Sequence, residues 1–225
     1  MEDKKNSVKP GDVIQPFVTK NARNGQSFQF DIIPADELLA SLSEDQLRQR
    51  FKIFRLRQIL DSLKSEYDYI LIDSPPNWRF LSASAIYASD VVLIPTKHNN
   101  IFSLENAAIA IKRFIPEVQQ VRKDGGPIAL PIFFNGEKIP EPQKITAYHA
   151  IDNLIEEAKK DKQKKFDMLP YFYPRYTPAK KDRHIFELPS YAHIASAAFS
   201  RMPAAYKDKT ARQYYLELAK EYFLQ

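Results

Sequence analysis

The spacing of apolar residues predicts short buried strands that alternate with helices along the chain. Short apolar runs bounded by turn-forming residues are typical of strands, and apolar residues that recur every three or four positions are typical of helices. Strands are predicted within 27–33, 69–72, 91–95 and 125–136. Helices are predicted over 35–65, 79–89, 103–116, 143–165 and 209–223. This alternation predicts an α/β fold with a mostly parallel sheet flanked by helices.

Three of the predicted strands end at a polar residue. Asp73, Thr96 and Asn135 each close an apolar run. In open parallel sheets, ligands bind beyond the carboxyl ends of the strands. We therefore expect a ligand site at this edge of the predicted sheet.

Length and composition limit the class of protein. The chain has 225 residues, of which 44% are hydrophobic, which suits one globular α/β domain over 1–225 with a polar, loosely structured segment at 1–26. It has no cysteine, so disulfides and thiolate metal sites are excluded. No apolar run approaches the roughly 20 residues of a membrane span, and the start MEDKKNSVKPGD lacks the apolar core of a signal peptide. We expect a cytoplasmic protein with no membrane partner.

The stretch YDYILIDSPPN, residues 67–77, has the chemistry of one half of a nucleotide site. A carboxylate at the end of a buried strand is held rigidly, and it suits a hard cation such as Mg²⁺. In NTPases this aspartate works beside a loop G-x-x-x-x-G-K-[ST], whose N–H groups and lysine hold the phosphates. The alternative is that Asp73 only caps the following turn.

A longer stretch, from residue 67 to residue 106, resembles the ParA/MinD-type partition ATPases, the deviant-Walker P-loop family. The family pattern is a strand ending D-[ST]-P-P, a helix of small residues, then A-x-D-x-V-L-I-P and a helix opened by Ser. Here it reads DSPP at 73–76, ASDVVLIP at 88–95 and SL at 103–104. A weaker likeness extends over about 27–225, through FDIIPADELLA, PIFFN and the final helix.

The resemblance implies a P-loop NTPase-like fold, with ATP and Mg²⁺ as cofactors. Asp73 would be the Walker B carboxylate on Mg²⁺. Asn135 would contact adenine, and Pro170 would line the base pocket. The residues by themselves leave two alternatives open, a turn residue before Gly136 for Asn135 and loop geometry for Pro170.

The family's phosphate loop, K-G-G-x-G-K-[ST], has no counterpart in this sequence. The chain has five glycines, and neither Gly-Lys-Ser nor Gly-Lys-Thr occurs. The acidic segment D-x-D-P-Q is absent too. We therefore predict a fold that is missing the first strand, which carries the loop, and the strand after it. Such a chain would not hydrolyse ATP alone, so no residue is assigned a catalytic role, and it would associate with a missing N-terminal half or form a homodimer.

The net charge of +5 arises in the second half of the chain, where residues 112–225 hold 20 Lys and Arg against 14 Asp and Glu. The resemblance implies non-specific DNA binding, and hence a location at the nucleoid, by phosphate neutralisation that weakens steeply with salt. The alternative is an ordinary solvated surface. The four histidines are far apart in the sequence and are assigned no chemistry. The candidate DNA-binding residues are Lys159, Lys160, Lys164, Lys165, Arg175, Lys180, Lys181 and Arg183.

The leading hypothesis for function is a chromosome or plasmid partition protein of the ParA type. In the intact family, ATP drives dimerisation, the dimer binds DNA, and a ParB-like partner stimulates hydrolysis. One alternative is a non-catalytic interaction module that keeps the partner or dimer face of the fold. Another is a MinD-like cell-division-site ATPase, which predicts a C-terminal amphipathic helix with a basic face. The end ARQYYLELAKEYFLQ mixes acidic and basic residues and predicts a packed helix instead.

Overall fold

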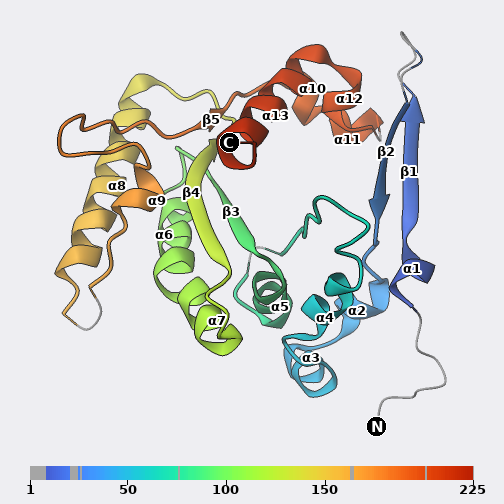
Figure 1. The fold of residues 1–225 in the computed structure, drawn as a ribbon. Coiled ribbons are helices and arrows are strands. Elements are labelled where there is room, and N and C mark those ends of the chain that lie inside the picture. Colours follow the sequence, from blue (N-terminus) through green and yellow to red (C-terminus); the bar gives the residue numbers. More distant parts are fainter. Residues whose placement is uncertain are drawn as a thin grey trace. The chain divides into compact units, whose positions relative to one another are not determined.

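The computed structural model of the chain describes residues 9–20, 25, 27–75, 77–162, 165–200 and 202–224 (Figure 1). The chain divides into two compact units, residues 1–88 and 89–225, each with its own strands and helices. Within the described residues, no helix is both long enough and apolar enough to cross a membrane.

The first unit begins with the short helix α1 (Pro10–Val13) and a two-stranded antiparallel hairpin. Strand β1 (Gln15–Lys20) pairs with β2 (Ser27–Ile32), and Phe17 lies opposite Phe30 with the ring centroids 4.8 Å apart. The strand predicted within 27–33 is therefore present. Its partner is antiparallel and comes from a segment for which the sequence predicted no element, because a hairpin pairing depends on contacts across the turn that periodicity does not reveal.

The prediction of a single helix over 35–65 is wrong. The structure has three short helices there, α2 (Glu37–Ser41), α3 (Glu44–Arg50) and α4 (Arg55–Asp61). A local cap separates the first two. The Ser43 side chain accepts a hydrogen bond from the N–H of Gln46, and the Gln46 side chain accepts one from the N–H of Ser43. This capping box begins a new helix, although the apolar spacing runs through it.

The prediction of a strand at 69–72 is also wrong. Residues 69–75 belong to no helix or strand, and the Leu71 side chain is 87% exposed. A strand forms only when a neighbour pairs its backbone groups, and the strands described in this unit, β1 and β2, pair with each other. Helix α5 (Phe80–Ala88) follows and confirms the helix predicted over 79–89.

Three parallel strands form the sheet of the second unit. Their order is β3 (Val91–Thr96), β4 (Ile128–Asn135) and β5 (Glu187–Leu188), so that β4 is central. The strands predicted within 91–95 and 125–136 are thus confirmed, and so is the α/β class with a parallel sheet. The sheet is smaller than predicted, because 27–33 lies in a hairpin and 69–72 in no strand.

The connection from β3 to β4 is a continuous helical segment made of α6 (Ile101–Ile109), the π-helical turn η2 (Ala110–Phe114) and α7 (Ile115–Arg122). The predicted limits of this helix are wrong at both ends. Asn100 rather than Ser103 is the N-cap, and its side chain accepts a hydrogen bond from the N–H of Ser103 at 3.2 Å. Pro116 lies in the first turn of α7, where a proline is tolerated, and does not end the helix.

Helices pack against each strand of this sheet and bury its centre (Figure 1). Helix α6 contacts β3, α9 (Leu169–Phe172) contacts β4, and α13 (Lys209–Tyr222) contacts β5. Ile132 and Phe134 of β4 are buried together with Phe172 of α9. The helices predicted over 143–165 and 209–223 are confirmed as α8 and α13. The helices beyond β4 are α8 (Glu141–Lys160), α9 (Leu169–Phe172), α10 (Ala192–Ala195), α11 (Ala197–Ser200), α12 (Ala204–Lys207) and α13 (Lys209–Tyr222).

Arg122, at the end of α7, holds the amino ends of β3 and β4 together. Its side chain is only 5% exposed, donates a hydrogen bond to the carbonyl of Ser89, and forms ion pairs with Asp90 at 3.5 Å and Asp124 at 2.8 Å. We predict that Arg122→Gln lowers the free energy of unfolding by about 1.5–3 kcal/mol, because it removes charge-assisted hydrogen bonds from a buried site. Urea denaturation measures this change.

Arg113→Gln is the matched control. Arg113 lies on the same helical segment, its side chain is exposed, and its partner is Glu117 one turn away. Exposed pairs at this spacing contribute about 0.5 kcal/mol or less. Equal losses in the two variants would show that Arg122 does not hold the strands.

Candidate functional site

The carboxyl ends of the three parallel strands meet at one edge of the second unit's sheet, the edge where α/β proteins bind ligands. Thr96 and Asn135, two of the three residues predicted to mark this edge, end β3 and β4. Thr96 is buried, and its hydroxyl donates a hydrogen bond to the carbonyl of Phe133 at 3.0 Å. Asn135 is exposed. At this edge, therefore, Asn135 presents a polar side chain to solvent, whereas Thr96 stabilises the sheet.

Gly136 fixes the chain direction directly after Asn135. Its N–H donates a hydrogen bond to the carbonyl of Leu188 in β5 at 2.8 Å, and its φ is +21°. A Cβ at this position would lie 3.0 Å from the same carbonyl oxygen. Only glycine allows so close an approach of two backbones. Asn135 is thus the last residue of a strand, and the turn begins at Gly136.

His98 is a buried polar residue at the same edge. Its side chain is 3% exposed, its ring stacks on Phe134 with centroids 3.4 Å apart, and its Nε2 lies 4.0 Å from a carboxylate oxygen of Glu187. Burial lowers the pKa of His98, and the nearby Glu187 carboxylate opposes part of that shift. Sequence reasoning assigned His98 no role, because its neighbours Phe134 and Glu187 are distant in the chain and give no spacing signal.

Two ion pairs surround His98. Lys97 Nζ lies 2.8 Å from Glu137 Oε1, and Lys144 Nζ lies 3.7 Å from Glu187 Oε2. The other carboxylate oxygen of Glu137 is buried without a hydrogen-bond partner. The edge thus combines an exposed amide with a compact group of alternating charges that fixes the loops after β3 and β4.

Pro170, predicted to line a base pocket, is exposed on α9. The helix packs against β4, the strand that ends at Asn135, and is anchored by the buried side chains of Met168 and Phe172. Asn135 and Pro170 therefore lie on two elements of one unit that contact each other. Their roles toward a nucleotide remain predictions.

Asp73 belongs to the first unit and is exposed. Among the described residues, no group of three or more His, Asp or Glu side chains is arranged to hold a metal ion. An exposed carboxylate nevertheless fits Mg²⁺, which keeps several of its waters and often takes one or two protein carboxylates. The prediction that Asp73 ends a buried strand is wrong, because residues 69–75 form no strand. Pro76 of the DSPP motif lies outside the described residues.

The candidate DNA-binding residues divide into two groups. Members of the first group form ion pairs. Arg175 donates hydrogen bonds to both carboxylate oxygens of Glu221, at 2.8 and 2.7 Å. Arg183 pairs with Asp152 at 3.0 Å, and Lys160 pairs with Glu156 one helical turn away. The other described members are exposed and have no ion pair within the described part of the chain. Lys164 lies outside the described residues. These exposed members are Lys159, Lys165, Lys180 and Lys181.

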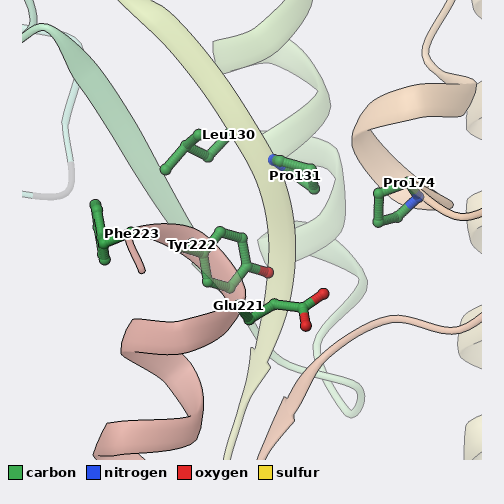
Figure 2. Close-up of a pocket in the computed structure, with 6 residues that line it drawn as sticks. All are labelled: Leu130, Pro131, Pro174, Glu221, Tyr222 and Phe223. Carbon is green, nitrogen blue, oxygen red and sulfur yellow. The ribbon is translucent and has the colours of Figure 1, made fainter. Parts of the chain in front are cut away.

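A hollow of about 290 Å³ lies beside β4 and the end of α13 (Figure 2). It is lined by Leu130, Pro131, Pro174, Glu221, Tyr222 and Phe223. The Tyr222 hydroxyl donates a hydrogen bond to the carbonyl of Ile132 at 3.1 Å, and Arg175 engages Glu221. Burial raises the pKa of Tyr222. The polar groups of the hollow thus join α13 to its surroundings, and none of the predicted site residues lines it.

The buried His98 makes stability depend on pH. A folded-state pKa below the unfolded value of about 6.5 means that the unfolded chain binds the proton more readily. We predict that the wild-type free energy of unfolding falls as pH drops below about 6.5, and that His98→Gln reduces this slope. Denaturant unfolding between about pH 7 and pH 5 measures the slope.

His149→Gln, which removes an exposed histidine of α8, is the control. It should retain the wild-type slope. If His98→Gln retains that slope too, burial of His98 does not govern the pH dependence.

Curated ParA-type proteins match part of the chain. A ParA family protein of Chlamydia pneumoniae is 39% identical over 71 residues, 31% of this chain and 28% of that protein. The chromosome partitioning protein ParA of Myxococcus xanthus is 42% identical over 64 residues, 28% and 23% of the two chains. The sporulation initiation inhibitor protein Soj of Bacillus subtilis is 34% identical over 90 residues, 40% and 34%. The matched stretch thus spans about a quarter to a third of the length of these relatives.

Solved structures of McdA share the fold. The ATP complex of a Cyanothece McdA variant superimposes with a TM-score of 0.61 and 18% identity over 95% of this chain and 70% of that one. Apo McdA gives a TM-score of 0.52 and 19% identity over 88% and 66%. At this level of identity the likeness shows the α/β fold alone.

A family model covers the stretch that carries the sequence motif. The AAA_31 family, described as an AAA domain, matches residues 8–126, which is more than half of the chain. The chain belongs to this family, and the relatives place it among the ParA-type partition ATPases.

Proposed function

We propose that this chain acts in chromosome or plasmid partition, in the cytoplasm at the nucleoid. It binds DNA non-specifically through exposed lysines of the second unit and contacts ATP–Mg²⁺ through Asp73, Asn135 and Pro170. The observation that carries the DNA-binding role is an anchored loop, residues 177–184, whose two lysines form no ion pair with any described residue; we call it the basic loop.

The basic loop is anchored near its carboxyl end by Arg183 and is closed by a hydrogen bond within it. Arg183 pairs with Asp152 of α8 at 3.0 Å, and its guanidinium lies over the ring of the buried Tyr173 at 5.6 Å from the centroid. The N–H of Lys181 donates a hydrogen bond to the carbonyl of Thr177 at 2.8 Å. Such anchoring lowers the entropy lost when the loop meets a ligand.

The tip of the basic loop displays two positive charges. Lys180 and Lys181 are exposed, and neither forms an ion pair with a described residue. Their ammonium groups are therefore available to neutralise phosphates. Arg175 and Arg183 were predicted to bind DNA directly, but their ion pairs give them a positioning role in this proposal.

The nucleotide side of the proposal is built from side-chain chemistry. A carboxamide presents a donor and an acceptor together, which complements an adenine edge, and Asn135 presents this group at the carboxyl end of β4. The Pro170 ring offers an apolar face to the base. Asp73 supplies the hard carboxylate oxygen that Mg²⁺ prefers, and the bound ion would bridge the phosphates.

Hydrolysis in this family needs a phosphate loop, which these 225 residues do not contain. We infer that the loop comes from polypeptide outside them, and that a ParB-like partner and dimerisation act on the completed ATPase. A homodimer of this chain alone would still lack the loop.

The lysines of the basic loop give a sharp test of DNA binding. We predict that the double variant Lys180→Ala, Lys181→Ala weakens binding of any duplex sequence. It should also reduce the slope of log affinity against log salt by about 2, because each lost phosphate contact removes about 0.9 of the slope. Fluorescence anisotropy with a labelled duplex at several salt concentrations measures both effects.

A second double variant separates loop position from net charge. The variant Arg113→Ala, Lys220→Ala also removes two positive charges, but from side chains that form ion pairs with Glu117 and Glu217. It should keep most of the affinity and the slope. Equal weakening by both double variants would assign DNA binding to net charge, and no binding by the wild type at low salt would remove the partition role for this chain.

The missing phosphate loop gives a second test. We predict that the chain by itself shows no micromolar affinity for ATP–Mg²⁺, because the N–H groups and lysine that hold the phosphates are absent from it. Isothermal titration calorimetry measures this directly. Micromolar affinity that Asp73→Ala abolishes would show instead that the chain contains a complete phosphate site of another kind.

A further inference from the structure

Asp152 of α8 joins three elements of the second unit through its two carboxylate oxygens. Its Oδ1 accepts a hydrogen bond of 3.0 Å from the hydroxyl of Tyr173, the residue that caps the end of α9. Its Oδ2 lies 3.0 Å from the guanidinium of Arg183 in the basic loop. The chain between α9 and β5, which contains this loop, passes beside α8 (Figure 1). One carboxylate thus ties the basic loop to two helices.

Tyr173 fixes this carboxylate from the buried side. Tyr173 is 2% exposed, and its ring stacks with that of Tyr148 of α8, with the centroids 6.2 Å apart. Burial raises the pKa of Tyr173, so the hydroxyl keeps its proton and donates it in the hydrogen bond to Asp152. Arg183 therefore pairs with a carboxylate that is held in place by a rigid neighbour.

The backbone of Lys181 shows that the basic loop is held in one particular conformation. Its φ is +45°, in the left-handed region that residues other than glycine seldom adopt. Such a conformation costs free energy and persists only where the surrounding contacts determine it. Two hydrogen bonds close the turn, from the N–H of Lys181 to the carbonyl of Thr177 at 2.8 Å and from the N–H of Lys180 to the Thr177 hydroxyl at 3.1 Å. The ion pair of Arg183 follows two residues later.

We propose that Asp152 is the positioning residue of the basic loop, and that its carboxylate strengthens DNA binding although DNA is itself an anion. Asp152 acts through Arg183, which holds the strained turn closed and so fixes the arrangement of Lys180 and Lys181. The loop is then ordered before DNA arrives, and less conformational entropy is lost on binding. This inference rests on the proposed function, because it takes duplex DNA as the ligand of the loop.

Two acidic residues of α8 distinguish positioning from charge. Asp152→Asn removes one negative charge but keeps the shape of the side chain and an oxygen for Tyr173. Glu156→Gln removes one negative charge a helical turn later, from a side chain that is 67% exposed and pairs with Lys160. If charge alone mattered, both variants would bind a polyanion more tightly. Positioning predicts weaker binding for Asp152→Asn only.

Fluorescence anisotropy with a labelled duplex at several salt concentrations measures the difference. Asp152→Asn should weaken binding by about threefold to tenfold, because the released loop has to be ordered on binding. The slope of log affinity against log salt should not fall, since the lysines that meet the phosphates are still present. Glu156→Gln should bind as tightly as the wild type or more tightly. Tighter binding by Asp152→Asn, or equal changes in both variants, would overturn the proposal.

Hydrogen exchange of the free chain tests the anchoring without DNA. The Lys181 amide should exchange about tenfold faster in Asp152→Asn than in the wild type, because its hydrogen bond depends on a closed loop. Arg183→Gln removes the same ion pair from the loop side and leaves α8 unchanged, so it should accelerate Lys181 to a similar extent. Glu156→Gln should keep the wild-type rate. A wild-type rate in both Asp152→Asn and Arg183→Gln would contradict the positioning role.

The proposed function and this inference fail separately. If the wild type binds no duplex at low salt, the partition role is contradicted, and the exchange of Lys181 still decides whether Asp152 positions the loop. If the wild type binds DNA but Lys181 exchanges at the same rate in all variants, the positioning role is contradicted and the DNA-binding role of the lysines stands.

Discussion

Pairing of strand backbones is the constraint on which the rest of this structure depends. A strand in a parallel sheet is stable only when its N–H and C=O groups find a neighbour. β4 has a neighbour on each side, and its Ile132 and Phe134 lie in the buried centre of the second unit. The segment 69–73 has an apolar sequence as well, yet it belongs to no strand and leaves Leu71 exposed. The difference between the two lies in their neighbours and not in their own residues.

The same constraint sets the chemistry of the second unit. Parallel pairing brings the ends of β3, β4 and β5 to one edge. There Glu187 of β5, together with Lys97, His98 and Glu137 from the loops after β3 and β4, forms one polar group beside the stacked His98–Phe134 pair. That group stabilises the loops and leaves Asn135 as the exposed polar end of β4. The basic loop is arranged in a similar way. Arg183 forms an ion pair with Asp152, and Lys180 and Lys181 are exposed in the same loop. In both places, ion pairs hold the backbone while neighbouring polar or charged side chains stay exposed.

Local patterns predicted the elements that depend on local signals. The runs at 91–95 and 125–136 gave β3 and β4, and the periodic segments gave α5, α8 and α13. The prediction of one helix over 35–65 was wrong because the Ser43 capping box begins a new helix despite the apolar spacing. The predicted end at Pro116 was wrong because the π-helical turn η2 leads directly into α7, which contains Pro116 in its first turn. His98 could not be found, since its partners are far away in the chain. The ion pairs of Arg175 and Arg183 were hidden for the same reason.

Family membership and activity have different physical bases in this chain. Family membership rests on the match over residues 8–126, a region that contains the DSPP and ASDVVLIP motifs. Activity requires that phosphate, metal and base contacts converge, and the residues assigned to them are distributed over two units that fold around separate cores. Asp73 follows a segment without strand neighbours, whereas Asn135 ends a strand whose partners are all present. The backbone that carries Asn135 is therefore fixed by strand pairing on both sides, whereas the backbone that carries Asp73 is fixed by side-chain hydrogen bonds such as that from Ser82 to the carbonyl of Pro75.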